Sequence, residues 1–187
     1  KDEVIHLYEM RELLELEAMR RIALPLDHDA LEQLRRIQAG HDAAIQQQDP
    51  RGIFRTNQEF HRLLFAQCGN VFLSQSIEDF ARQTHAIRFG TLMSRERQLQ
   101  SQKEHHELLA VLAQGEGSRE RLIRLTAEHV VPPRDHYLKT QEALCLEVLT
   151  IQEHASNIVS RGQRTAQRCG PLANLGDQGG IACCRPA

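Results

Sequence analysis

The sequence predicts an all-α protein, and three observations support this prediction. Apolar residues recur at helical spacing in successive segments, whereas runs typical of strands are nearly absent. Aromatic residues make up only 4% of the chain and tryptophan is absent, so the core should consist mainly of Leu, Ile, Ala and Val. Such a core suits helices better than a β-sandwich. The 187 residues, 41% of them hydrophobic, are enough for one domain of ordinary size.

The first half of the chain contains three expected helices. The first spans about 4–24 and ends at Pro25. Asp27 is a suitable N-cap for the second, whose apolar stripe includes Leu31 and Leu34. Asp49 and Pro50 combine a cap residue with a proline at the first helical position, which predicts the start of the third helix. The tripeptide Cys68-Gly69-Asn70 should end it, with glycine in a left-handed conformation.

Three further helices follow in the second half. The fourth is expected over about 71–93. Ser101 and Glu104 form a capping-box pattern that should open the fifth, which the Gly115–Ser118 stretch then ends. Ser118 is a candidate cap for the sixth helix, over about 119–139, and two prolines within that range should bend or interrupt it.

The character of the sequence changes after Thr140. We therefore expect one domain over 1–139, followed in 140–187 by an extra helix and then a tail. From Ser160 onward the sequence is aperiodic and rich in Gly, Arg and Cys, which predicts a disordered or non-native segment.

Composition excludes several functional classes. The formal net charge of −2 gives this segment no basic excess for binding nucleic acid, and no apolar run is long enough to span a membrane. The five cysteines are odd in number and unevenly spaced, which argues against a disulfide framework and for a reducing, cytoplasmic environment. The chain starts within an apparent helix and without Met, so we expect a fragment or a processed product.

Four residues on three expected helices could hold a divalent metal: Asn57, His61, His105 and His129. Three imidazoles and an amide oxygen form a sensible ligand set for such an ion. Asn57 and His61 are four residues apart and so share a helix face. Taken singly, however, each histidine is more often a surface or core residue, and His106 is a rival to His105. Spacing alone leaves the other histidines as surface candidates: His6, His28, His41, His85, His136 and His154.

The order of features resembles one family, the FCD domain, which is the C-terminal effector domain of FadR-type regulators in the GntR superfamily. The resemblance covers about residues 4–139. The matching positions are Tyr8, Arg11, Glu15, Phe60-His61, Gly69-Asn70, Glu104-His105, Leu108-Leu109 and His129.

This resemblance implies an antiparallel bundle of six or seven helices with a metal site in its core. Asn57, His61, His105 and His129 would be the ligands, zinc or nickel the metal, and a small organic acid the effector that completes the coordination. The family also implies a homodimer, with DNA bound by a winged helix-turn-helix domain that this chain lacks. Asn57 departs from the usual Asp, which removes a negative charge and should weaken metal binding.

Two arginines are candidate anchors for the effector carboxylate, because a guanidinium suits that pairing. The alternative for Arg11 is an ion pair with Glu15, one turn along the same helix. The alternative for Arg88 is a solvated helix face.

Two other functions compete with effector sensing in a transcription regulator. One is a helical-bundle metalloenzyme with three histidines and an open metal position, for which Glu104 and Glu107 are the local candidate bases. The other is a helical dimerisation module in which all histidines are structural.

Overall fold

The computed structural model describes residues 2–130, 132–141 and 143. Among them there are helices and no strand, so the all-α prediction is confirmed. The chain divides into a unit of residues 1–142 and a unit of residues 143–187, and only the first lies almost wholly within the described residues. Of the extra helix and tail predicted over 140–187, all but residues 140, 141 and 143 lie outside the described residues, as does residue 131 beside the two prolines.

Six α-helices and a short 3-10 turn are followed by further helical residues over 119–130 and 132–141. The bounded elements are α1 (Asp2–Arg21), α2 (His28–Gln46), α3 (Pro50–Ala66), α4 (Val71–Gln83), α5 (His85–Thr91), α6 (Arg95–Leu112) and η1 (Glu116–Ser118). None of the described helices is both long and apolar enough to cross a membrane.

Local sequence signals set the ends of α2, α3 and α4. The Asp27 carboxylate accepts hydrogen bonds from the backbone N–H groups of the first turn of α2, and Asp49 caps α3 ahead of Pro50. Gly69 has φ of +70°, as expected for the residue that ends α3. Asn70 then caps α4 through its side-chain oxygen. These predicted boundaries are therefore confirmed.

Three other boundary predictions were wrong. The helix expected over 71–93 is two helices separated at Thr84, whose buried hydroxyl bonds the Phe80 carbonyl and accepts from Arg11. The helix α6 begins at Arg95, after Ser94, so Ser101 is a buried residue inside it rather than its cap. Ser118 donates to the carbonyls of Val111 and Gly115 instead of capping the next helix. In each case packing overrode a short local motif.

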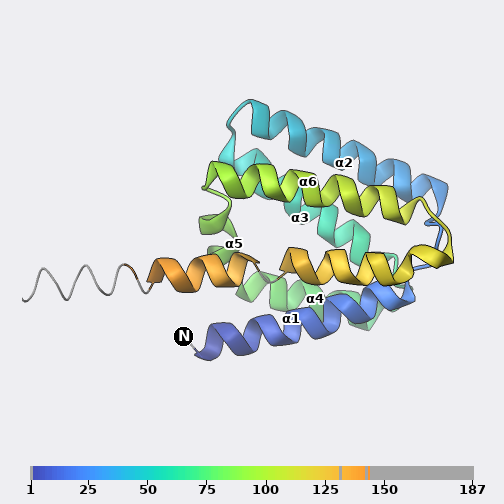
Figure 1. Cartoon of the computed structure of the whole chain (residues 1–187), viewed down its shortest axis with the longest axis horizontal. Helices are drawn as coiled ribbons and strands as arrows, with labels where there is room; N and C mark the ends of the chain where they lie inside the picture. Colours follow the sequence, from blue (N-terminus) through green and yellow to red (C-terminus); the bar gives the residue numbers. More distant parts are fainter. Residues whose placement is uncertain (1, 131, 142, 144–187) are drawn as a thin grey trace, which may run out of the picture. The chain divides into compact units, whose positions relative to one another are not determined.

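The main hydrophobic core joins α1, α2, α3, α6 and the 119–130 helix. Leu34, Phe60, Leu108 and Leu122 each bring a buried side chain to it from a different element. Figure 1 shows α2 beside α3 and α6, with consecutive helices running back and forth. Arg119 donates to three carbonyls at the end of α1 and so attaches the start of the 119–130 helix to it.

Candidate metal and effector site

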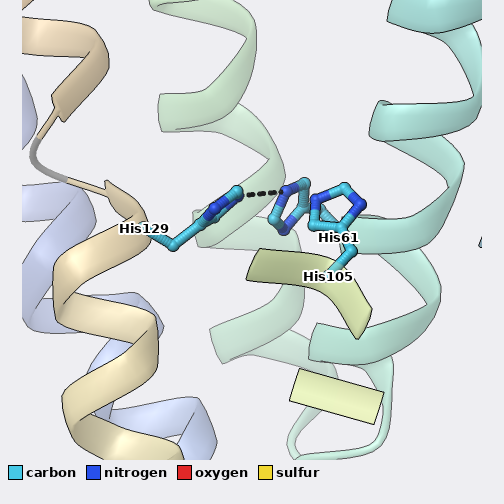
Figure 2. Close-up of side chains that lie close together, drawn as sticks. All are labelled: His61, His105 and His129. Carbon is cyan, nitrogen blue, oxygen red and sulfur yellow. Dashed lines mark hydrogen bonds between the residues drawn. The ribbon is translucent and has the colours of Figure 1, made fainter. Parts of the chain in front are cut away.

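Three imidazoles meet in the interior of the bundle. His61 comes from α3, His105 from α6 and His129 from the 119–130 helix, and all three are buried. One ligand atom from each lies within 4.8 Å of the others. Figure 2 shows the three rings converging from different helices, with a hydrogen bond between His61 and His129. The predicted histidines therefore come together, although they are 24 to 68 positions apart along the chain.

Glu104 orients the ring of His129. The Nδ1 of His129 lies 2.5 Å from Glu104 Oε2, and both guanidinium NH groups of Arg97 also donate to this carboxylate. Burial alone would raise the pKa of Glu104, but the hydrogen bonds from His129 and Arg97 lower it to about 2. The carboxylate is thus ionised, and it favours the His129 tautomer that carries its proton on Nδ1.

Gln38 orients His105 in the same way. The Nδ1 of His105 donates to the Gln38 side-chain oxygen at 2.8 Å, and the Gln38 amide in turn donates to Asp42 at 2.7 Å. With the proton on Nδ1, His105 Nε2 carries a lone pair. That atom is buried and has no hydrogen-bond partner among the described residues. An unpartnered buried acceptor is costly, and a bound cation would satisfy it.

His61 and His129 face each other through their Nε2 atoms, 3.0 Å apart. When the His129 ring donates from Nδ1 to Glu104 and its Nε2 accepts, His61 Nε2–H is the donor to His129 Nε2. The other ring nitrogen of His61, Nδ1, is then a buried acceptor that no group in the described part of the chain bonds. A neutral His61 can instead carry its proton on Nδ1, which turns both Nε2 lone pairs toward the space between the rings.

The site keeps His61 and His105 uncharged. Burial lowers the pKa of His61 and of His105 well below the ordinary value, and the neighbouring imidazoles lower it further. Neutral imidazole is the form that binds a metal. The convergence of the three rings and the uncharged state of His61 and His105 therefore fit a divalent cation held by three nitrogens.

Asn57 lies beside the histidine cluster. It is buried on α3, and it lines a small cavity of about 20 Å³ together with His61 and His129. Ser101, which was predicted to be a helix N-cap but lies inside α6, lines the same cavity. The structure thus places all four predicted ligand residues around one interior region.

Arg11 and Arg88 lie at one side of this region. Arg11 forms the buried ion pair with Glu15 that was the alternative to effector binding, with N–O distances of 2.7 and 2.9 Å. Arg88 is also buried, so the solvated face considered for it is wrong. Burial, and then the nearby Arg11, lower the pKa of Arg88 to about 10. Within the described part of the chain, no acceptor bonds its guanidinium.

A second, larger cavity of about 470 Å³ adjoins the first. Both cavities are lined by Arg11, His61 and Arg88. The larger one continues between α3 and α4. An anion at Arg88 would therefore sit where the two cavities share their walls.

His41 is the residue that sequence reasoning placed wrongly. It was expected at the surface, but it is completely buried, and its ring centroid lies 5.3 Å from that of His105. Its Nδ1 lies within hydrogen-bond distance of Thr56 and of the Ile53 carbonyl. A usable signal was present in α2, because one helix face carries the buried residues Leu34, Gln38, His41 and Ile45.

His106 shows the opposite behaviour to its neighbour His105. Its side chain is 54% exposed, and its Nε2 lies 3.0 Å from Asp42 on α2. The prediction that only one of the two adjacent histidines faces the core is therefore confirmed, and that residue is His105.

Comparison with known proteins identifies a matching domain family and a solved structure with a similar fold. The family model described as "FCD domain" matches residues 6–131, which is more than half of the chain. No curated protein matches at a significant level. A solved structure of Lar, which is described as controlling the expression of the Listeria monocytogenes agr system and mediating virulence, has a TM-score of 0.63 and 18% identity. The match covers 74% of this chain and 64% of that chain, so it supports the fold.

Proposed function

The chain belongs to the FCD domain family, and from this premise we propose that it is the effector-sensing, metal-binding domain of a bacterial GntR-type transcription regulator. Its effector would be a small organic acid bound at a divalent metal, zinc or nickel. DNA would be bound by a winged helix-turn-helix domain elsewhere in the full protein, and the cytoplasm would be its compartment.

One observation carries the metal part of this proposal. His61, His105 and His129 are buried, and one ligand atom from each lies within 4.8 Å of the others. His61 and His105 are uncharged, and each has a buried ring nitrogen without a hydrogen-bond partner among the described residues. Asn57 lines a small cavity together with His61 and His129, and in this proposal it adds an oxygen ligand. A metal in such a site supplies a Lewis acid to which carboxylate and hydroxyl oxygens of an effector can bind.

The effector part rests on the buried guanidinium of Arg88. A buried cation without a partner is unfavourable, so an anion that binds there is favoured by both charge and desolvation. Glu15 neutralises Arg11, which leaves Arg88 as the excess positive charge. Arg88 is therefore the main residue that binds the effector carboxylate, and Arg11 lines the cavity beside it.

The contacts of Glu104 and Glu107 do not favour the alternative function, a helical-bundle metalloenzyme in which one of them is the general base. Glu104 is engaged by Arg97 and His129, and its pKa is lowered to about 2, which makes it a weak general base at neutral pH. Glu107 is directed to Lys103, 3.8 Å away. Both carboxylates that were candidate bases thus have other partners.

The proposed regulation is a linkage between effector and DNA. An effector that binds one arrangement of a homodimer better than another shifts the population of arrangements, and hence the affinity for a two-fold operator. The change in operator affinity that the effector can cause is limited by the difference between its own affinities for the two arrangements.

The test of the proposal is metal content followed by ligand-induced stabilisation. We expect the purified chain, incubated with zinc or nickel and then dialysed, to retain about one metal per chain by elemental analysis. A short hydroxy acid should raise the melting temperature of the loaded protein. His61→Ala should lose both the metal and this shift while keeping its helical circular dichroism signal.

Adjacent histidines provide a matched control. His105→Ala removes a buried ring of the cluster, whereas His106→Ala removes a surface ring from the next position. We expect metal loss only for His105→Ala. A wild-type chain that retains no metal after reconstitution, or equal retention in the two variants, would overturn the metal site.

A further inference from the structure

Apart from His61, the larger cavity is lined by residues outside the histidine cluster. Its inner end is formed by Arg11, His61 and Arg88, and it extends from there between α3 and α4. Its volume of about 470 Å³ lies within the range of pockets that hold drug-sized ligands, roughly 300–1,000 Å³. A compact acid bound at Arg88 and the histidines would occupy only its inner end.

The walls beyond the inner end are suited to an apolar body. Phe65 from α3 and Ile77 from α4 are buried residues that line the cavity, and Ala81 lines it one turn further along α4. Small and apolar side chains here leave space where a larger residue would fill the gap. A methylene chain or ring against these walls would be removed from water.

The outer end of the cavity is polar. Arg55 and Arg62 lie two turns apart on one face of α3 and are exposed, and both line the cavity. Gln58 and Gln75 line it from α3 and α4. A ligand that reached this end could leave its last atoms hydrated or hydrogen-bonded.

We propose that the effector is a carboxylic acid with an elongated body, whose carboxylate binds at Arg88 and whose body lies along Phe65, Ile77 and Ala81 between α3 and α4. This inference rests on the proposed function for the position of the carboxylate. It goes beyond that proposal by assigning a second binding region and by naming the class of acid.

The experiment compares straight-chain acids of increasing length as probes. Acetate, butyrate, hexanoate and octanoate are titrated into the zinc-loaded chain by calorimetry. Each methylene buried on the cavity wall should increase affinity by about twofold to fourfold. An Arg88→Gln variant should weaken every acid, because all share the carboxylate.

Filling the cavity should remove the length dependence alone. Ala81→Phe is expected to reduce the affinity for octanoate at least tenfold while leaving the affinity for acetate and the zinc content unchanged. Ala66→Phe fills the same cavity from α3 and serves as a second variant should the first fold poorly. Ala110→Phe, on an exposed position of α6, is the control and should behave as wild type.

The outcomes separate the two proposals. Short acids that bind through zinc and Arg88, with no gain from added length, would overturn the elongated effector and leave the proposed function intact. A gain with length that persists in both filled variants would also overturn it. Failure of every acid to bind the zinc-loaded chain would instead overturn the proposed function.

Discussion

The histidine cluster depends on acceptors that hold each ring in place. Glu104 fixes His129, and Gln38 fixes His105, each through the ring's Nδ1. Arg97 in turn holds the Glu104 carboxylate through two hydrogen bonds. Residues that orient a metal-binding imidazole commonly affect metal affinity by about 10–100-fold. Glu104 is therefore a positioning residue for the proposed metal.

The first prediction concerns Glu104→Gln. This change keeps the size of the side chain but removes the charge that favours the Nδ1–H tautomer of His129. We expect zinc affinity to fall about 10–100-fold, measured by competition with a chromophoric chelator. Glu107→Gln is the control, since Glu107 lies on the same helix and its carboxylate lies 3.8 Å from Lys103 Nζ. Equal zinc affinity in the two variants would contradict the role assigned to Glu104.

The second prediction concerns pH and the metal-free protein. Folding lowers the pKa of His61 and His105, mainly by burial, below the value of about 6.5 found in unfolded chains. Below that value the unfolded state binds more protons than the folded state, so the free energy of unfolding decreases as pH falls through about 6.5. Urea denaturation after chelation should show a lower midpoint at pH 5.5 than at pH 7.5.

A histidine variant tests whether the buried imidazoles cause this pH dependence of stability. His105→Gln removes one buried titrating ring, so its midpoint should change less between pH 7.5 and 5.5 than that of the wild type. A wild-type midpoint that does not change over this interval would show that the buried imidazoles do not govern stability there.

For single residues, the sequence predicted which histidines belong to the cluster better than it predicted which histidines are buried. Helical neighbours point about 100° apart, so only one of His105 and His106 could face the core, and the motif selected the correct one. His41 was missed because a lone histidine gives no local sign of burial. The signal that could have indicated its burial is its position on the same helix face as Leu34 and Ile45.

At the scale of elements, the turn between α2 and α3 is tightly built. Gly52 lies in the first turn of α3, and an added Cβ there would run into the Asp49 carboxylate and lie 3.1 Å from the Ala44 Cβ. Asp49 is the N-cap of α3. Gly90 in α5 has open space at the corresponding position. Adding a methyl group at Gly52 and at Gly90 should therefore have different effects on stability.

The third prediction compares Gly52→Ala with Gly90→Ala. Gly52→Ala should displace the Asp49 cap and destabilise the protein by about 1 kcal/mol or more, in the range of lost N-caps. Gly90→Ala should be neutral or stabilise by up to about 1 kcal/mol, because alanine restricts the unfolded chain. Chemical denaturation measures both values. A stabilising effect at Gly52 would mean that the turn can relax without losing its cap.

Caps and glycine signals predicted element boundaries well where they acted locally. Asp27, Asp49 and Asn70 all accept backbone N–H groups at helix starts. The capping-box pattern at Ser101 failed because the residues before it already continue the helix and Ser101 itself is buried. The break at Thr84 could not be predicted, since it involves a contact with Arg11, 73 positions away.

At the scale of the whole molecule, several large apolar side chains of the described residues remain exposed. On α1 these are Met10 and Leu13, at 39% and 59% exposure, and on α4 they are Val71 and Phe72, at 59% and 78%. Met10 and Leu13 are three residues apart and so share one helix face. Exposed apolar residues on one face of an outer helix are typical of protein–protein contacts.

The fourth prediction is that the chain forms a homodimer through the outer face of α1. Regulators that bind two-fold operators need a two-fold partner, and a self-complementary apolar face is the simplest way to provide one. Light scattering coupled to size exclusion should give about twice the chain mass of 21.4 kDa. Leu13→Glu should shift the mass toward the monomer, because it places a charge in the interface. Leu99→Glu, at an exposed position of α6, is the control and should remain dimeric. A wild-type monomer at high micromolar concentration would contradict the dimer, whereas a Leu13→Glu dimer would move the interface away from α1.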